Sequence, residues 1–132
     1  MAKMIHSMVR VLDEARSLDF YQLAFGFRII ERLDFETFTL IYLGSDETPF
    51  ELELTVNKGR TEPYQMGDGY GHLAVSVDDI EAEHARFTEA GLAPGKLLGN
   101  NGLLQSKRFF QFADGALAII QRAQNKQARF MR

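Results

Sequence analysis

The feature that most constrains this chain is that its sequence repeats itself. Residues 5–13 recur in pattern as residues 71–79, and in both copies a histidine in an alternating stretch precedes an aspartate. The offset between the copies is 66 residues, from His6 to His72. In a chain of 132 residues this predicts two homologous halves, each one supersecondary unit.

Each copy opens with the two-residue alternation of a half-buried strand. In the first copy, His6, Met8 and Arg10 share one face, and small or apolar residues share the other. The second copy alternates in the same way from His72 onward. We therefore expect both histidines on the face opposite the valines.

A helix follows each strand, over residues 13–25 and 79–90. Aspartate begins both segments, where it can cap free backbone N–H groups, and Gly26 or Gly91 follows the last turn. The predicted sheet-facing stripes are Leu18, Tyr21 and Phe25, and then Ile80, His84 and Phe87. His84 is interpreted as a packing residue.

The remaining strands complete a βαβββ order in each half. They are predicted at residues 27–33, 37–43 and 50–57, and then at 96–98, 108–112 and 116–122. The fold class is α+β, with two βαβββ modules forming a curved mixed sheet cup and helices on the outer face. We expect a single domain over residues 1–132, with modules at about 4–57 and 70–122, a linker at 58–69 and a polar basic tail at 123–132.

The composition of the chain excludes several classes of partner and metal site. The formal net charge is −3, the wrong sign for a protein that follows phosphate backbones, so nucleic acid is not an expected partner. The chain has no cysteine, which excludes disulfides and thiolate metal sites and leaves nitrogen and oxygen ligands. No apolar run is long enough for a membrane span, and we expect a soluble cytoplasmic protein without a membrane partner.

Residues 50–57 alternate in a way that suggests a metal site. One face is apolar, and the other carries Glu51, Glu53, Thr55 and Asn57. Two halves related by a pseudo-two-fold axis would bring His6, Glu53 and His72 together. Two imidazoles and one carboxylate suit Zn²⁺, Ni²⁺, Co²⁺ or Fe²⁺ and leave positions open for a substrate.

Four segments together resemble bacterial glyoxalase I, the lactoylglutathione lyases of the vicinal oxygen chelate superfamily. They are His-Ser-Met-Val-Arg-Val from His6, Arg-Ser-Leu-Asp-Phe-Tyr from Arg16, Glu-Leu-Thr-Val-Asn-Lys-Gly from Glu53, and Gly-His-Leu-Ala-Val-Ser-Val from Gly71. The resemblance implies a homodimer that isomerises the glutathione hemithioacetal of methylglyoxal to S-lactoylglutathione. It covers the chain up to about residue 122 and is most specific in the first 80 residues.

The resemblance also implies a ligand set in the order His, Glu, His, Glu. His6, Glu53 and His72 match the first three positions and would hold a divalent metal, nickel or zinc. The fourth position falls at Ile119, both by the repeat offset and by its distance from Asp114-Gly115, and isoleucine is not a ligand. In the family that fourth glutamate is also a catalytic base, which leaves Glu53 as the expected base here.

Gln121 and Glu51 are the two alternative bases. Gln121 lies one strand repeat, roughly 6.5 Å, beyond the position of the fourth ligand. Glu51 lies two residues before Glu53, and its side chain would have to reorient to reach the substrate.

The resemblance assigns substrate binding to Arg10 and Asn57, at positions that bind the glutathione γ-glutamyl carboxylate in the family. Two other readings stay open. The missing fourth ligand suits a non-catalytic protein that binds or sequesters a small molecule. The His, His and carboxylate set also resembles the facial triad of non-haem iron, which suits a different enzyme of the superfamily, such as an oxygenase.

Overall fold

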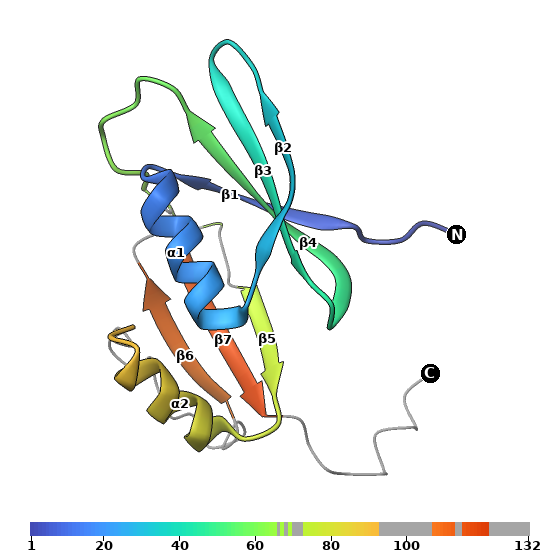
Figure 1. The fold of residues 1–132 in the computed structure, drawn as a ribbon, viewed down its shortest axis with the longest axis vertical. Helices are drawn as coiled ribbons and strands as arrows, with labels where there is room; N and C mark the ends of the chain where they lie inside the picture. Colours follow the sequence, from blue (N-terminus) through green and yellow to red (C-terminus); the bar gives the residue numbers. More distant parts are fainter. Residues whose placement is uncertain (66, 68, 70–72, 93–106, 113–114, 122–132) are drawn as a thin grey trace. The chain divides into compact units, whose positions relative to one another are not determined.

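The computed structural model describes residues 1–65, 67, 69, 73–92, 107–112 and 115–121. The chain divides into two compact units, the first over residues 1–70 with 113–115 and the second over residues 71–112 with 116–132. Each unit has its own sheet and its own helix, as Figure 1 shows. The fold is α+β with curved, mixed sheets, which confirms the fold class predicted from the sequence.

The first unit has the predicted βαβββ order. Its elements are β1 (His6–Val11), α1 (Glu14–Phe25), β2 (Arg28–Asp34), β3 (Phe38–Ser45) and β4 (Thr48–Asn57). The strands form one sheet in the order β1-β4-β3-β2, in which β1 runs parallel to β4 and the other pairs are antiparallel (Figure 1). The first and last strands of the unit therefore lie side by side.

One face of this sheet forms the core of the unit. Val9 is paired with Leu54, and Leu54 with Ile41, so the three share a face, and all are buried. Helix α1 buries Ser17, Tyr21 and Ala24. The predicted stripe was partly wrong, because Leu18 and Phe25 are only half-buried while the small residues Ser17 and Ala24 are buried.

The two ends of α1 agree with the sequence prediction. Asp13 caps the helix, and its carboxylate accepts a hydrogen bond from the Arg16 backbone N–H at 2.9 Å. Gly26 ends it at a φ of 65°, and its N–H donates to the Gln22 carbonyl. A left-handed residue at this position favours glycine, which has no Cβ to clash.

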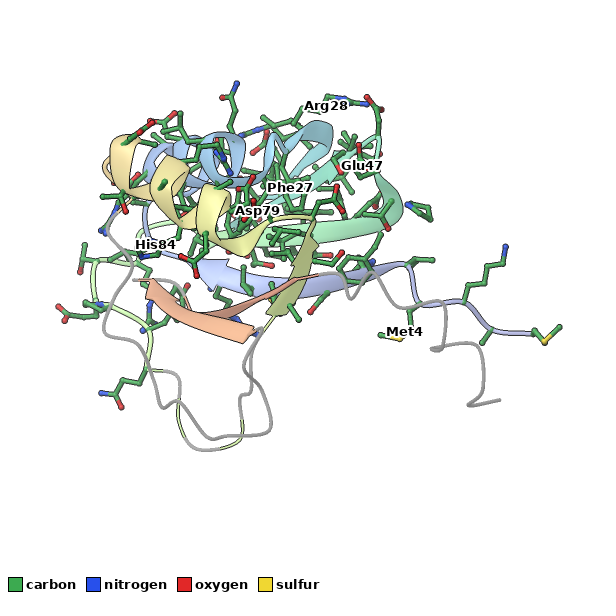
Figure 2. All side chains as sticks on the ribbon, turned by 90° about the horizontal axis from the view of Figure 1, so that it is seen from below. Met4, Phe27, Arg28, Glu47, Asp79 and His84 are labelled. Atoms are coloured by element: carbon green, nitrogen blue, oxygen red, sulfur yellow. The ribbon has the colours of Figure 1, made fainter. Side chains whose placement is uncertain are left out.

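The second unit contains β5 (Leu73–Val77), α2 (Ile80–Glu89), β6 (Lys107–Phe112) and β7 (Gly115–Gln121). The sheet order is β5-β7-β6, with β5 parallel to β7. Asp79 caps α2 by accepting from the Glu81 and Ala82 N–H groups, and Figure 2 labels it together with His84 of the same helix. The strand expected at residues 96–98 lies outside the described residues.

The helix α2 buries Phe87, as the predicted stripe requires, and leaves His84 half-buried. Neither α1 nor α2, the two helices of the described part of the chain, is long and apolar enough to cross a membrane.

Candidate metal and substrate site

The face of the first sheet opposite the core carries the candidate site, and we call it the polar face. It is defined by the pairs that β1 makes with β4, and Tyr42 of β3 joins it through its pairing with Glu53. The paired positions are His6 with Glu51, Met8 with Glu53, and Arg10 with Thr55. Asn57 follows two residues after Thr55, on the same face by alternation.

The central contact on the polar face joins His6 to Glu53. The Nε2 atom of His6 lies 3.4 Å from Oε2 of Glu53. The Glu53 side chain is only 11% exposed, whereas the His6 side chain is 35% exposed. A buried carboxylate beside an accessible imidazole is an arrangement that can bind a cation from solvent.

The 3.4 Å separation also fits two ligands of one metal ion. Donor atoms that each lie about 2.0–2.2 Å from an ion, at a tetrahedral angle, are about 3.3–3.6 Å from each other. Within the described residues no group of three His, Cys, Asp or Glu side chains gathers around a common point. The described part of the chain thus brings together two of the three predicted ligands, and the third, His72, lies outside it.

The Thr55 hydroxyl holds the Glu53 carboxylate, and Tyr42 is paired with Glu53 on the neighbouring strand. The Thr55 Oγ1 donates to Oε1 of Glu53 at 3.2 Å. The hydrogen bond between Tyr42 and Glu53, followed by burial, raises the pKa of the Tyr42 phenol above its ordinary value, so the phenol stays a donor. The Tyr42 ring also meets the His6 ring edge-on, with centroids 5.6 Å apart.

Together these contacts give the two carboxylate oxygens different roles. Oε1 faces the Thr55 hydroxyl, and Oε2 faces the imidazole. The fixed orientation leaves Oε2 as the atom available to a metal or to a substrate proton.

The predicted substrate residues lie at one end of the polar face. Arg10 is exposed, and it pairs in register with Thr55. Asn57 ends β4, and its Nδ2 donates to the Tyr64 hydroxyl at 2.7 Å. Their role in binding a substrate stays a prediction.

The pairing of β5 with β7 bears on the missing fourth ligand. In the first unit Met8 is opposite Glu53, and the repeat partner of Met8 is Ala74. Ala74 is opposite Ala118, whereas Ile119 is opposite Val75. By strand pairing, the residue equivalent to Glu53 is therefore Ala118, one position before Ile119, which the repeat offset indicates. The difference arises because the second unit has one residue fewer between its two paired strand positions than the first unit has. Alanine, like isoleucine, has no side-chain atom that binds a metal.

Tyr42 and Tyr64 were not predicted from the sequence as residues of this site. Tyr42 lies in a continuous apolar run of β3, and a tyrosine there needs a partner for its hydroxyl, which was the available signal. Tyr64 lies in the predicted linker, where no pattern indicated a contact with Asn57.

Comparisons with known proteins identify the family of this chain. Residues 3–117 match the model of the Glyoxalase/Bleomycin resistance protein/Dioxygenase superfamily. The chain belongs to this family. A lactoylglutathione lyase of Neisseria meningitidis serogroup A is 46% identical over 93 residues, which are 67% of this chain and 67% of that protein. A probable lactoylglutathione lyase of Vibrio cholerae is 34% identical and covers 96% of this chain and 93% of its own length.

A solved structure agrees with these sequence relatives. The trypanothione-dependent glyoxalase I of Leishmania major superposes with a TM-score of 0.76 at 28% identity, over 92% of this chain and 87% of that one. Within the family, this chain is a lyase-like enzyme.

Proposed function

We propose that this protein is a metal-dependent glyoxalase I that converts the hemithioacetal of methylglyoxal and glutathione to S-lactoylglutathione. The observation that carries the proposal is the His6–Glu53 pair, in which a buried carboxylate accepts from Thr55 at Oε1 and places Oε2 3.4 Å from an accessible imidazole nitrogen. The lactoylglutathione lyases among its relatives support the same reaction.

His6, Glu53 and His72 would hold the divalent metal, nickel or zinc. When bound there, such an ion acts as a Lewis acid toward the substrate oxygens. Only three protein ligands are proposed, since the fourth position is apolar at both Ala118 and Ile119.

Glu53 would move the proton. The isomerisation takes a proton from the carbon that bears sulfur and hydroxyl and returns it to the neighbouring carbonyl carbon. The hydroxyl proton passes to the former carbonyl oxygen, so the first carbon becomes the thioester carbonyl, and no oxidant and no second substrate is needed. The Thr55 hydroxyl donates to Oε1 of the carboxylate, and the carboxylate would accept and return the proton.

Arg10 and Asn57 would bind the γ-glutamyl end of glutathione. The Arg10 guanidinium is a planar fork suited to a carboxylate, and Asn57 lies on the same face, one strand repeat past the residue paired with Arg10. We also propose a homodimer in the cytoplasm, as the resemblance and the composition predict.

The test is thioester formation by metal-stripped protein after nickel or zinc is restored. We expect activity to return with metal, and we expect Glu53→Gln to lower kcat by about 10²–10⁴-fold, because a positioned base contributes that much. Glu51→Gln is the matched control, since Glu51 lies on the same face one strand repeat away and pairs with His6. Glu51→Gln should stay within a few-fold of wild type.

The second candidate function is the binding of a small molecule without catalysis. The apolar residues at the fourth position are the observation that favours it. Wild-type protein that forms no thioester with either metal would contradict the enzyme proposal. Full activity in Glu53→Gln would contradict the role of Glu53.

A further inference from the structure

Tyr42 lies in a row of side chains that crosses the polar face from β2 to β1. Strand pairing places Tyr42 of β3 opposite Glu31 on one side and opposite Glu53 on the other. Met8 of β1 ends the row, opposite Glu53. Residues directly opposite each other in an antiparallel pair share one face of the sheet, with Cβ atoms about 4.5–5.5 Å apart. Tyr42 is therefore the immediate neighbour of the proposed base on the β3 side.

A second contact holds the Tyr42 ring on this face. The ring meets the His6 ring edge-on, with centroids 5.6 Å apart and an angle of 74° between the ring planes. The His6 imidazole in turn lies 3.4 Å from Glu53, measured from Nε2 to Oε2. Tyr42 is half-buried, so part of its side chain stays open to solvent. The tyrosine thus contacts one proposed metal ligand, adjoins another, and remains accessible to a small molecule bound beside them.

The surroundings of the Tyr42 phenol keep its proton in place. The hydrogen bond with Glu53, followed by burial, raises the pKa of the phenol above its ordinary value. The nearby carboxylates of Glu53, Glu31 and Glu51 raise this pKa further. A neutral phenol has one O–H to donate and carries no charge that would repel an anion. Its hydroxyl is therefore suited to an oxygen that becomes negative during a reaction.

The proposed isomerisation creates such an oxygen beside Glu53. When the base removes the proton from the carbon that bears sulfur, the electron pair of the broken bond forms a carbon–carbon double bond. The π pair of the neighbouring carbonyl then moves onto its oxygen, which is two bonds from the carbon that lost the proton. A substrate with this carbon against Glu53 brings the oxygen within the surroundings of that residue. On the β3 side, these surroundings consist of Tyr42.

We propose that Tyr42 is a catalytic residue whose hydroxyl donates a hydrogen bond to the substrate carbonyl oxygen as negative charge develops on it. The proton from carbon goes to Glu53, the electron pair goes to the oxygen, and the O–H bond of Tyr42 stays intact. This inference rests on the proposed function, because it names a further residue for the same reaction. A donor directed at charge that develops in the transition state raises kcat without tightening the binding of substrate.

The experiment compares transition-state with ground-state binding in Tyr42→Phe, which keeps the ring that contacts His6 and removes only the hydroxyl. Thioester formation is measured with nickel at saturation, so that a change in metal affinity does not enter. Calorimetry then compares S-methylglutathione with S-(N-hydroxy-N-methylcarbamoyl)glutathione. The hydroxamate group of the second probe imitates the two adjacent oxygens and the negative charge of the reacting atoms. Tyr21→Phe, which loses a phenol hydroxyl in the core of the first unit, is the matched control.

We expect Tyr42→Phe to lower kcat by about 10²–10³-fold, the usual effect of removing one such donor, and to leave KM within a few-fold of wild type. The affinity for the hydroxamate should fall by at least about tenfold, since a hydrogen bond to a charged group is lost. The affinity for S-methylglutathione should not change. Tyr21→Phe should match wild type in all of these measurements.

A double-mutant cycle separates donation to the ligand from an effect exerted through Glu53. Hydroxamate affinity is measured in Glu53→Gln with and without Tyr42→Phe. If the phenol donates to the ligand directly, its removal weakens binding by the same factor in both backgrounds. A loss that vanishes in the Glu53→Gln background would overturn the proposal, because Tyr42 would then act only through Glu53.

Three other results would also overturn it: unchanged kcat in Tyr42→Phe, equal loss of affinity for both probes, and no binding of the hydroxamate by wild-type protein. A wild type that forms no thioester but loses hydroxamate affinity in Tyr42→Phe would overturn the proposed isomerase and leave the donor role of Tyr42 standing.

Discussion

At the scale of single residues, the polar face is organised around the Glu53 carboxylate. Burial of a charged group is costly unless its oxygens are hydrogen-bonded. Glu53 meets this condition at Oε1, which accepts from Thr55, and it keeps Oε2 directed at His6. The Thr55 hydroxyl that makes burial tolerable therefore also sets the orientation of the carboxylate that is proposed to act.

Removing the Tyr42 hydroxyl tests this arrangement. Tyr42→Phe keeps the ring that contacts His6 and deletes the hydrogen bond to Glu53. If Glu53 binds a metal, we expect nickel affinity to fall by about 10–100-fold, the usual effect of losing a group that orients a ligand. Competition with a coloured chelator measures the change.

Tyr21→Phe, which loses a hydroxyl in the core, should leave nickel affinity unchanged. Equal affinity in wild type and Tyr42→Phe would show that the phenol does not orient the carboxylate.

Residue-scale prediction from sequence succeeded where strand alternation was clear. The alternation in β1 and β4 was enough to place His6 and Glu53 on one face, and the structure brings them into contact. Tyr42 was missed because its strand, β3, has no polar alternation to separate its faces. Tyr64 was missed because its contact with Asn57 depends on a turn, which a periodic pattern does not encode.

At the scale of elements, a charged cluster joins α1 to β2. Arg32 of β2 forms an ion pair with Glu14 in the first turn of α1 and donates to Asp34 at 3.0 Å. Asp34 also accepts from the buried Thr39 hydroxyl at 2.6 Å. The Thr39 hydrogen bond, and next the one from Arg32, lowers the pKa of Asp34 below its ordinary value.

The lowered pKa makes a prediction about acid stability. A carboxyl whose pKa is lower in the folded state stabilises the fold above its unfolded pKa, and this contribution is lost as the pH falls through the folded pKa. Asp34→Asn should therefore unfold at lower urea concentration than wild type at about pH 7, and the difference should shrink below about pH 4.

Asp19→Asn, an exposed position on α1, serves as the control and should show neither effect. A constant difference between wild type and Asp34→Asn at all pH values would refute the proposed linkage.

Element-scale prediction was accurate for the strands of the first unit and for the caps of both helices. Alternation and capping are local properties, and β4 and the aspartates at 13 and 79 follow them directly. The buried stripe of α1 was partly misjudged because large apolar residues were favoured. The structure instead buries Ser17 and Ala24, whose small side chains allow close packing that apolarity alone does not reveal.

At the scale of the whole molecule, the internal repeat predicted two units of similar order, and the structure has two. The two units do not match residue for residue. An offset of 66 from Glu53 leads to Ile119, but the residue of β7 that pairs with β5 as Glu53 pairs with β1 is Ala118. A single deletion between paired strands produces this shift without changing the order of elements. Because such a deletion leaves the order of helices and strands unchanged, the fold could be predicted from the sequence. The residue at the fourth ligand position could not, since it depends on the strand pairing.

His6 and Glu53 are two of the three protein ligands that we propose for a metal ion, and calorimetric titration of the metal-stripped protein with Ni²⁺ and Zn²⁺ tests this role. We predict one ion per chain for wild type and an affinity at least about tenfold weaker for His6→Ala. His84→Ala removes an imidazole from α2 and should bind as wild type does. Wild-type protein that binds neither metal, or His6→Ala that binds as tightly as wild type, would contradict the account.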